Sequence, residues 1–86
     1  MLDRTKHPVG WVQFVDELKD AHEHLGNLIQ EMSDDPEYDD ANFRVDLGHV
    51  LAHLYRAWNC RDIPDSMTDD QWEAARTVPT DLEPVA

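Results

Sequence analysis

The chain has 86 residues, which suits one small domain, and it carries 19 acidic against 7 basic residues for a formal net charge of −12. Nucleic acids and anionic membranes are bound through basic surface, so this charge argues against both as partners. No apolar run approaches the ~20 residues of a membrane span, and no apolar signal region follows the first residues. The single cysteine, Cys60, excludes an intrachain disulfide and fits a reducing compartment. We therefore expect a cytoplasmic protein.

The first predicted element is a helix from about Pro8 to Met32, preceded by a flexible arm of residues 1–7. Proline suits the first turn of a helix, where its missing N–H costs nothing. At about 100° per residue, the large apolar side chains share one arc of roughly 140°. They are Trp11, Phe14, Val15, Leu18, Ala21, Leu25, Leu28, Ile29 and Met32.

The same spacing places most polar residues of this first helix outside the apolar arc and one of them inside it. Glu17, Asp20 and Glu23 are expected to face away from the apolar arc, and His24 is expected on the solvent side. His22 falls inside the arc, where we expect a hydrogen-bonded boundary histidine or, alternatively, a pH switch or a ligand at a dimer interface.

The segment of residues 33–40 ends the first helix, because it combines Pro36 with a cluster of turn-forming acids. A second helix is predicted to follow and to run to about Arg61. Either Asp35 or Asp39 can cap its start. The short connection predicts antiparallel neighbours, an αα-hairpin.

The second helix has more apolar surface than one neighbour can cover, because its non-polar arc spans roughly 200°. We therefore expect further contact with a third helix or with a second copy of the chain. Two hairpins that form a four-helix bundle give a homodimer. In each hairpin Gly26 and Gly48 are expected at the same height, where facing glycines would let the backbones approach closely.

The C-terminal part is predicted to hold a short third helix and an extended tail. Thr68-Asp-Asp-Gln71 matches a capping box, which predicts a helix over Asp69–Arg76 with Trp72 as its large anchor. Residues 77–86 contain two prolines and should be extended. The predicted class is all-α, with residues 8–76 as a single helical domain.

One constellation on the second helix is suited to metal binding. Asp46-x-x-His49-x-x-x-His53 places a carboxylate and two imidazoles on one helix face. An i, i+4 histidine pair is the spacing by which one helix presents two nitrogens to a zinc or nickel ion. The glutamate of the HExxH protease signature is absent. Asp46, His49 and His53 are therefore candidate metal ligands, and otherwise they are exposed histidines beside an acidic neighbour. No other cofactor is expected.

No catalytic set is recognisable, so we expect a protein that is not an enzyme. Ser33 and Ser66 lie in predicted turns without a Gly-x-Ser-x-Gly elbow, and no Gly-rich phosphate loop is present. The first functional hypothesis is a small acidic helical module, homodimeric, that binds another protein, for which a basic partner suits the charge. The second is a divalent-metal-binding protein that uses Asp46, His49 and His53. The third is an acidic decoy that inhibits a nucleic-acid-binding protein.

Overall fold

A computed structural model describes all 86 residues. The chain forms three helices and no strand, in the order α1 (Pro8–Asp34), α2 (Asp40–Cys60) and α3 (Asp69–Ala74). The predicted all-α class is confirmed. None of these helices combines the length and the apolar character that crossing a membrane requires.

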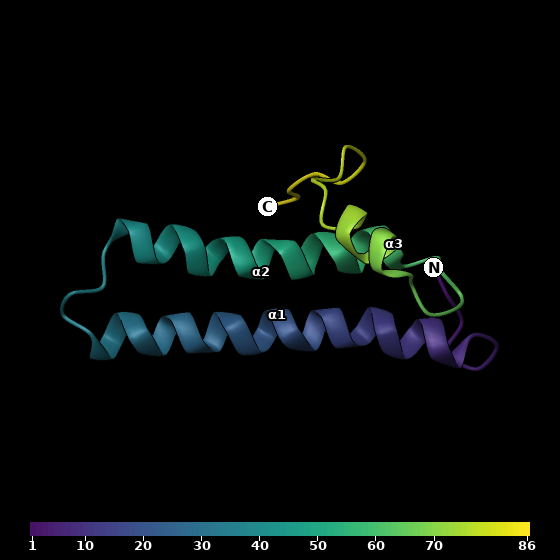
Figure 1. The fold of residues 1–86 in the computed structure, drawn as a ribbon, viewed down its shortest axis with the longest axis horizontal. Helices are drawn as coiled ribbons and strands as arrows, with labels where there is room; N and C mark the ends of the chain where they lie inside the picture. The colour runs from purple at the N-terminus through teal and green to yellow at the C-terminus, as the bar shows by residue number, and fades with distance from the viewer.

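The two long helices lie side by side and run in opposite directions (Figure 1). The cap of α2 is Asp39, whose side chain accepts a hydrogen bond from the backbone N–H of Asn42 at 2.9 Å. Asp35 belongs instead to the end of α1, because its backbone N–H donates to the carbonyl of Glu31 at 2.9 Å. Of the two predicted caps, the structure therefore selects the later one.

The contact between α1 and α2 has a small apolar core. Ala21 and Leu28 of α1 form a buried cluster with Val50 of α2, and Phe43 packs against it. In the N-terminal half of α1, one turn before Ala21, the buried residues include Glu17, a carboxylate. Small and polar side chains thus occupy the middle of the interface.

The predicted apolar arc of α1 is rotated relative to the observed contact. Four of its large members are between 41% and 55% exposed, namely Leu18, Leu25, Ile29 and Met32. The prediction weighted side chains by hydrophobicity alone, whereas the observed contact line follows Glu17, Ala21 and Leu28. Glu17 has hydrogen-bonding partners on two other elements, and these offset the cost of burying its carboxylate where a larger apolar residue was expected.

The prediction that Gly26 and Gly48 face each other is wrong. A Cβ added at either position would meet no atom within 4 Å. The close backbone approach occurs at Gly10, whose N–H donates to the carbonyl of Pro64 at 3.0 Å. A Cβ at Gly10 would press on the carbonyl of Ile63 and lie 2.7 Å from that of Pro64. Only glycine fits there without displacement of the segment that follows α2.

The predicted capping box of α3 is present. The Thr68 side chain accepts from the backbone N–H of Gln71 at 3.2 Å, and the Gln71 side chain accepts from that of Thr68 at 2.9 Å. The helix ends at Ala74, two residues before the predicted end at Arg76.

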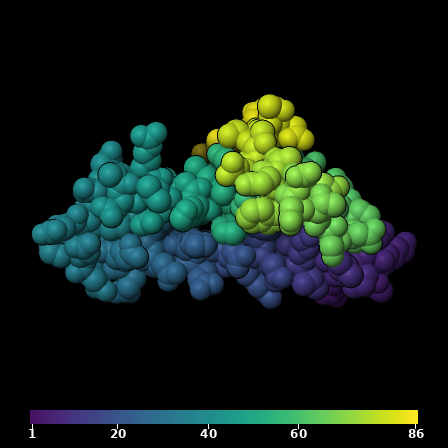
Figure 2. Space-filling view, in the orientation of Figure 1, coloured from purple at the N-terminus to yellow at the C-terminus, as the bar shows by residue number.

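Both ends of the chain lie over the same half of the helix pair. Leu2 is buried, and its N–H donates to the carbonyl of Arg61 at 2.9 Å. The tail is anchored where Trp58 Nε1 donates to Asp81 Oδ1 at 2.9 Å. Figure 2 shows the C-terminal segment stacked on this half, while the half next to the connection of residues 35–39 has no such cover.

Candidate functional site

The structure gives Asp46, the first residue of the predicted metal triad, a partner of its own. Its carboxylate accepts a hydrogen bond from the Tyr38 hydroxyl at 2.8 Å. Partial burial and the adjacent Asp46 carboxylate raise the pKa of Tyr38 to about 12. His49 is exposed, and His53 turns toward α1. The three predicted ligands therefore do not share one set of contacts.

Glu17 of α1 is a buried carboxylate that contacts both α2 and α3. Its side chain is 8% exposed. One carboxylate oxygen lies 2.6 Å from His53 Nδ1, and the other accepts from Trp72 Nε1 at 3.2 Å. Burying a carboxylate is costly unless it is hydrogen-bonded, and here each oxygen has a partner. Glu17 lies away from the large apolar residues of α1, as predicted, but those residues do not face α2, so Glu17 is buried in the contact between the helices.

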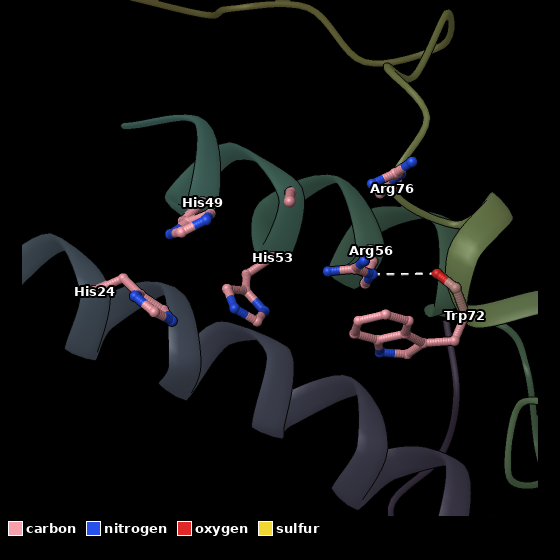
Figure 3. A pocket seen from close by; sticks show the side chains of 7 residues that line it. His24, His49, His53, Arg56, Trp72 and Arg76 are labelled. Atoms are coloured by element: carbon pink, nitrogen blue, oxygen red, sulfur yellow. Dashed lines mark hydrogen bonds between the residues drawn. The ribbon is translucent and has the colours of Figure 1, made fainter. Parts of the chain in front are cut away.

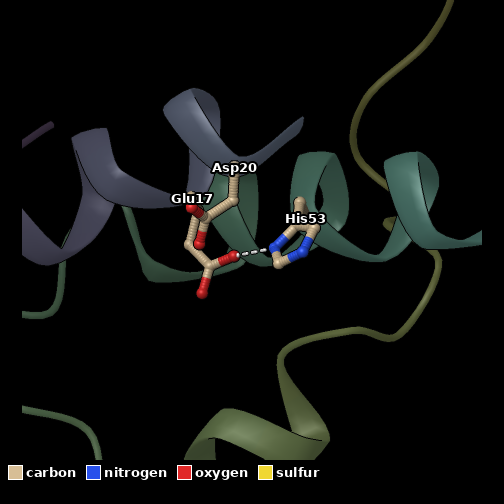
Figure 4. Close-up of side chains that lie close together, drawn as sticks. All are labelled: Glu17, Asp20 and His53. Carbon is tan, nitrogen blue, oxygen red and sulfur yellow. Dashed lines mark hydrogen bonds and ion pairs between the residues drawn. The ribbon is translucent and has the colours of Figure 1, made fainter. Parts of the chain in front are cut away.

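Asp20 lies one helical turn after Glu17 and extends the cluster toward solvent (Figure 4). Glu17, Asp20 and His53 each place one potential ligand atom so that all three atoms lie within 4.8 Å of one another. The set mixes carboxylate oxygens with imidazole nitrogen, which are donors that zinc accepts.

Two more imidazoles adjoin His53. The His24 ring lies nearly parallel to the His53 ring, with centroids 5.0 Å apart and an interplanar angle of 19°. The same ring meets His49 edge-on at a centroid distance of 5.7 Å. His24 is thus half-buried between the helices and not on the solvent side as predicted. His22, predicted near the contact, is exposed.

These three histidines border an open hollow of about 320 Å³ (Figure 3). Its other lining residues are Ala52, Arg56, Trp72 and Arg76. Arg56 is buried, stacks its guanidinium 3.5 Å from the centre of the Trp72 ring, and donates from Nε to the Trp72 carbonyl at 3.1 Å. Trp72 is therefore held by both long helices, and it fixes α3 as one wall of the hollow.

The lone cysteine is not available as a nucleophile. Cys60 is fully buried, and burial together with the negative charge of Glu17 raises the pKa of its thiol to about 11. The reactive thiolate is thus scarce near neutral pH.

The opposite side of the helix pair is apolar and largely exposed, although Leu47 and Trp58 within it are half-buried. We call this surface the apolar face and define it by Leu18, Leu25, Ile29 and Met32 of α1 with Leu47, Leu51, Leu54 and Trp58 of α2. Leu18 and Leu54 line one groove of about 390 Å³, which places the stripes of the two helices on the same side. Helical spacing puts Glu17, Asp20 and His24 on the other side.

No protein-family model matches the sequence, and no similar chain is found among curated proteins or among solved structures. The two surfaces are therefore interpreted from their own geometry.

The sequence prediction found His49 and His53 but missed Glu17, Asp20 and His24. A signal was present, because Asp20-x-x-x-His24 repeats on α1 the spacing of His49-x-x-x-His53 on α2.

Proposed function

We propose that this chain is a small acidic interaction module without catalytic activity, and that it docks a second copy of itself through the apolar face. Two helical hairpins would then form a four-helix bundle. A single cysteine suits a reducing compartment, so we assign the module to the cytoplasm.

The observation that carries this proposal is the exposure of the apolar face. The four α1 members are between 41% and 55% exposed, and Leu51 and Leu54 of α2 are 37% and 41% exposed. Soluble monomers rarely expose contiguous apolar patches larger than a few hundred Å². Side chains of this kind on two neighbouring helices therefore favour a partner that covers them.

A second copy suits this surface in charge and in symmetry. The chain carries a net charge of −12, yet no member of the apolar face is acidic. Away from Trp58, where Asp81 of the tail lies, two such faces can therefore meet without bringing carboxylates together. A two-fold interface uses the same patch on both subunits, and two-fold dimers are the commonest oligomers.

The expected strength follows from the exposed fractions. Fully burying a large aliphatic side chain contributes about 1.5–3 kcal/mol, so covering the remaining half of six such residues contributes about 4–9 kcal/mol per protomer. Association itself costs about 4–15 kcal/mol. We therefore expect a reversible dimer whose population depends on protein concentration, not a permanent one.

Sedimentation equilibrium between about 1 µM and 1 mM tests this, since that range resolves association free energies of about −8 to −4 kcal/mol. The apparent mass should rise toward twice the monomer mass as the protein concentration increases. Ile29→Glu should stay monomeric, because it places a charge in the apolar face. Val12→Glu is the matched control, since Val12 is 56% exposed against 55% for Ile29 and points away from this face.

Circular dichroism verifies that both variants keep their helices. A wild-type chain that remains monomeric at the highest concentration would overturn the proposed dimer. Equal dimerisation of Ile29→Glu and Val12→Glu would overturn the assignment of the apolar face.

A further inference from the structure

We propose that the hairpin binds one divalent transition-metal ion, zinc by its donor chemistry, between α1 and α2. The ligands are Asp20 and His24 of α1 with His49 and His53 of α2. This site lies on the side opposite to the apolar face, and it does not depend on the proposed dimer.

The first support is the spacing on each helix. Asp20 and His24 are four residues apart, and so are His49 and His53. Side chains at i and i+4 are neighbours on a helix surface, so each helix offers two donors one turn apart. The antiparallel arrangement places these two pairs opposite each other.

The second support is the distance between the donors. Zinc–nitrogen bonds of about 2.0–2.1 Å in a tetrahedral site place neighbouring imidazole rings about 5–6 Å apart, centre to centre. The His24 ring lies 5.0 Å from that of His53 and 5.7 Å from that of His49. A carboxylate oxygen of Asp20 is within 4.8 Å of a ring nitrogen of His53. Asp20 is thus close to His53, and His24 is close to both other imidazoles.

The third support is the hydrogen bond of His53. Its Nδ1 is held by Glu17 at 2.6 Å, which leaves Nε2 for an ion. Metal-binding histidines in proteins commonly donate their other ring nitrogen to a carboxylate in this way. The buried Glu17 thus fixes the orientation of His53 from behind.

The surrounding charges are compatible with a cation. Glu17 and Asp20 are the carboxylates next to the imidazoles. Arg56 and Arg76 lie beyond His53 toward α3, whereas His24 and His49 lie on its other side (Figure 3). Coordination requires the His24 ring to turn out of its parallel stack on His53, and the adjoining hollow leaves room for this rotation.

Titration calorimetry of the untagged, full-length chain with zinc chloride near neutral pH tests the proposal. The wild-type chain should bind one zinc ion per chain. His24→Ala and His49→Ala should each lower the affinity at least tenfold. His22→Ala is the matched control, because His22 is an exposed histidine on the other side of α1, and its affinity should equal that of the wild type. His24 and His49 are chosen over His53 because removing His53 would leave the buried Glu17 without its partner.

Three results would overturn the site. The first is the absence of one-to-one zinc binding by the wild-type chain. The second is an unchanged affinity in His24→Ala and His49→Ala, as expected for an ion held only by Glu17, Asp20 and His53. The third is an equal loss in His22→Ala, which would indicate nonspecific histidine binding. Ile29→Glu should keep the wild-type affinity, which separates failure of this site from failure of the dimer.

Discussion

Alanine substitution at the three glycines should change stability with opposite signs. Gly26 and Gly48 are helical and face open space, since an added Cβ meets nothing within 4 Å. Gly10 is also helical, but the carbonyls of Ile63 and Pro64 and the side chain of Leu2 lie against it. The same chemical change therefore probes two environments.

The magnitudes follow from these contacts. Glycine is about 0.8–1.0 kcal/mol less favourable than alanine in a helix interior, so Gly26→Ala and Gly48→Ala should each stabilise the fold by about that amount. At Gly10 the clash with backbone oxygens costs about 1–3 kcal/mol. Movement of the Ile63–Pro64 segment also weakens the hydrogen bond from Gly10 to the carbonyl of Pro64, worth about 0.5–1.5 kcal/mol. After the gain in helix propensity, a net loss of about 0.5–3.7 kcal/mol remains.

Thermal unfolding followed by circular dichroism measures these changes. In a domain of this size 1 kcal/mol shifts the melting temperature by about 4–8 °C. Gly26→Ala and Gly48→Ala should therefore each raise it by about that much, and Gly10→Ala should lower it by about 2–30 °C. All variants are compared at one low micromolar concentration, because association would add a concentration-dependent term. A Gly10→Ala chain as stable as the wild type would refute the contact of α1 with residues 63–64.

Two further predictions concern titratable groups. At about pH 8 the Cys60 thiol should react with a disulfide reagent far more slowly in the folded chain than in guanidinium. The reason is that burial raises its pKa to about 11, and the thiolate is the attacking form. Equal rates in the two conditions would contradict the burial of Cys60. In a Tyr55→Phe background, ultraviolet titration should show Tyr38 ionising at about 12, and Asp46→Asn should bring its pKa down toward 10.0. Since the folded value is the higher one, the stabilising contribution of this hydroxyl is complete below the unfolded value and is lost as the pH rises through about 12.

The elements that the sequence predicted correctly are those with local signals. Pro8 starts α1, the capping box from Thr68 to Gln71 starts α3, and Asp39 was one of two predicted caps for α2. Each signal is complete within a few residues, so no knowledge of tertiary contacts is needed to read it.

The rotation of α1 about its axis was not predictable in the same way. The apolar arc was defined by side-chain hydrophobicity, which assumes that the largest apolar residues face the nearest helix. Glu17 is buried because His53 and Trp72 supply its hydrogen bonds. These partners are 36 and 55 residues away in the sequence, so no local pattern identifies them.

The candidate site was half predictable for the same reason. The i, i+4 spacing of His49 and His53 is visible within α2, and both residues belong to the observed cluster. Whether Asp20 and His24 join them depends on the register between the helices, which the sequence does not specify. Asp46 shares the face of His49 in sequence, but the hydroxyl of Tyr38, in the connection before α2, donates a hydrogen bond to its carboxylate.

The position of Glu17 also bears on the apolar face. Turning α1 about its axis by roughly 80°, at about 100° per residue, would bring Leu18 and Leu25 against α2 and bury more apolar surface within one chain. That arrangement would turn Glu17 toward solvent and separate it from His53 and Trp72, so both of its hydrogen bonds would be lost. The observed rotation instead keeps the carboxylate–imidazole pair between the helices and turns the leucines outward. An exposed leucine surface is costly in a monomer, whereas a second copy that covers it removes this cost. The polar pair inside the hairpin and the proposed dimer outside it are thus two consequences of a single choice of helix rotation.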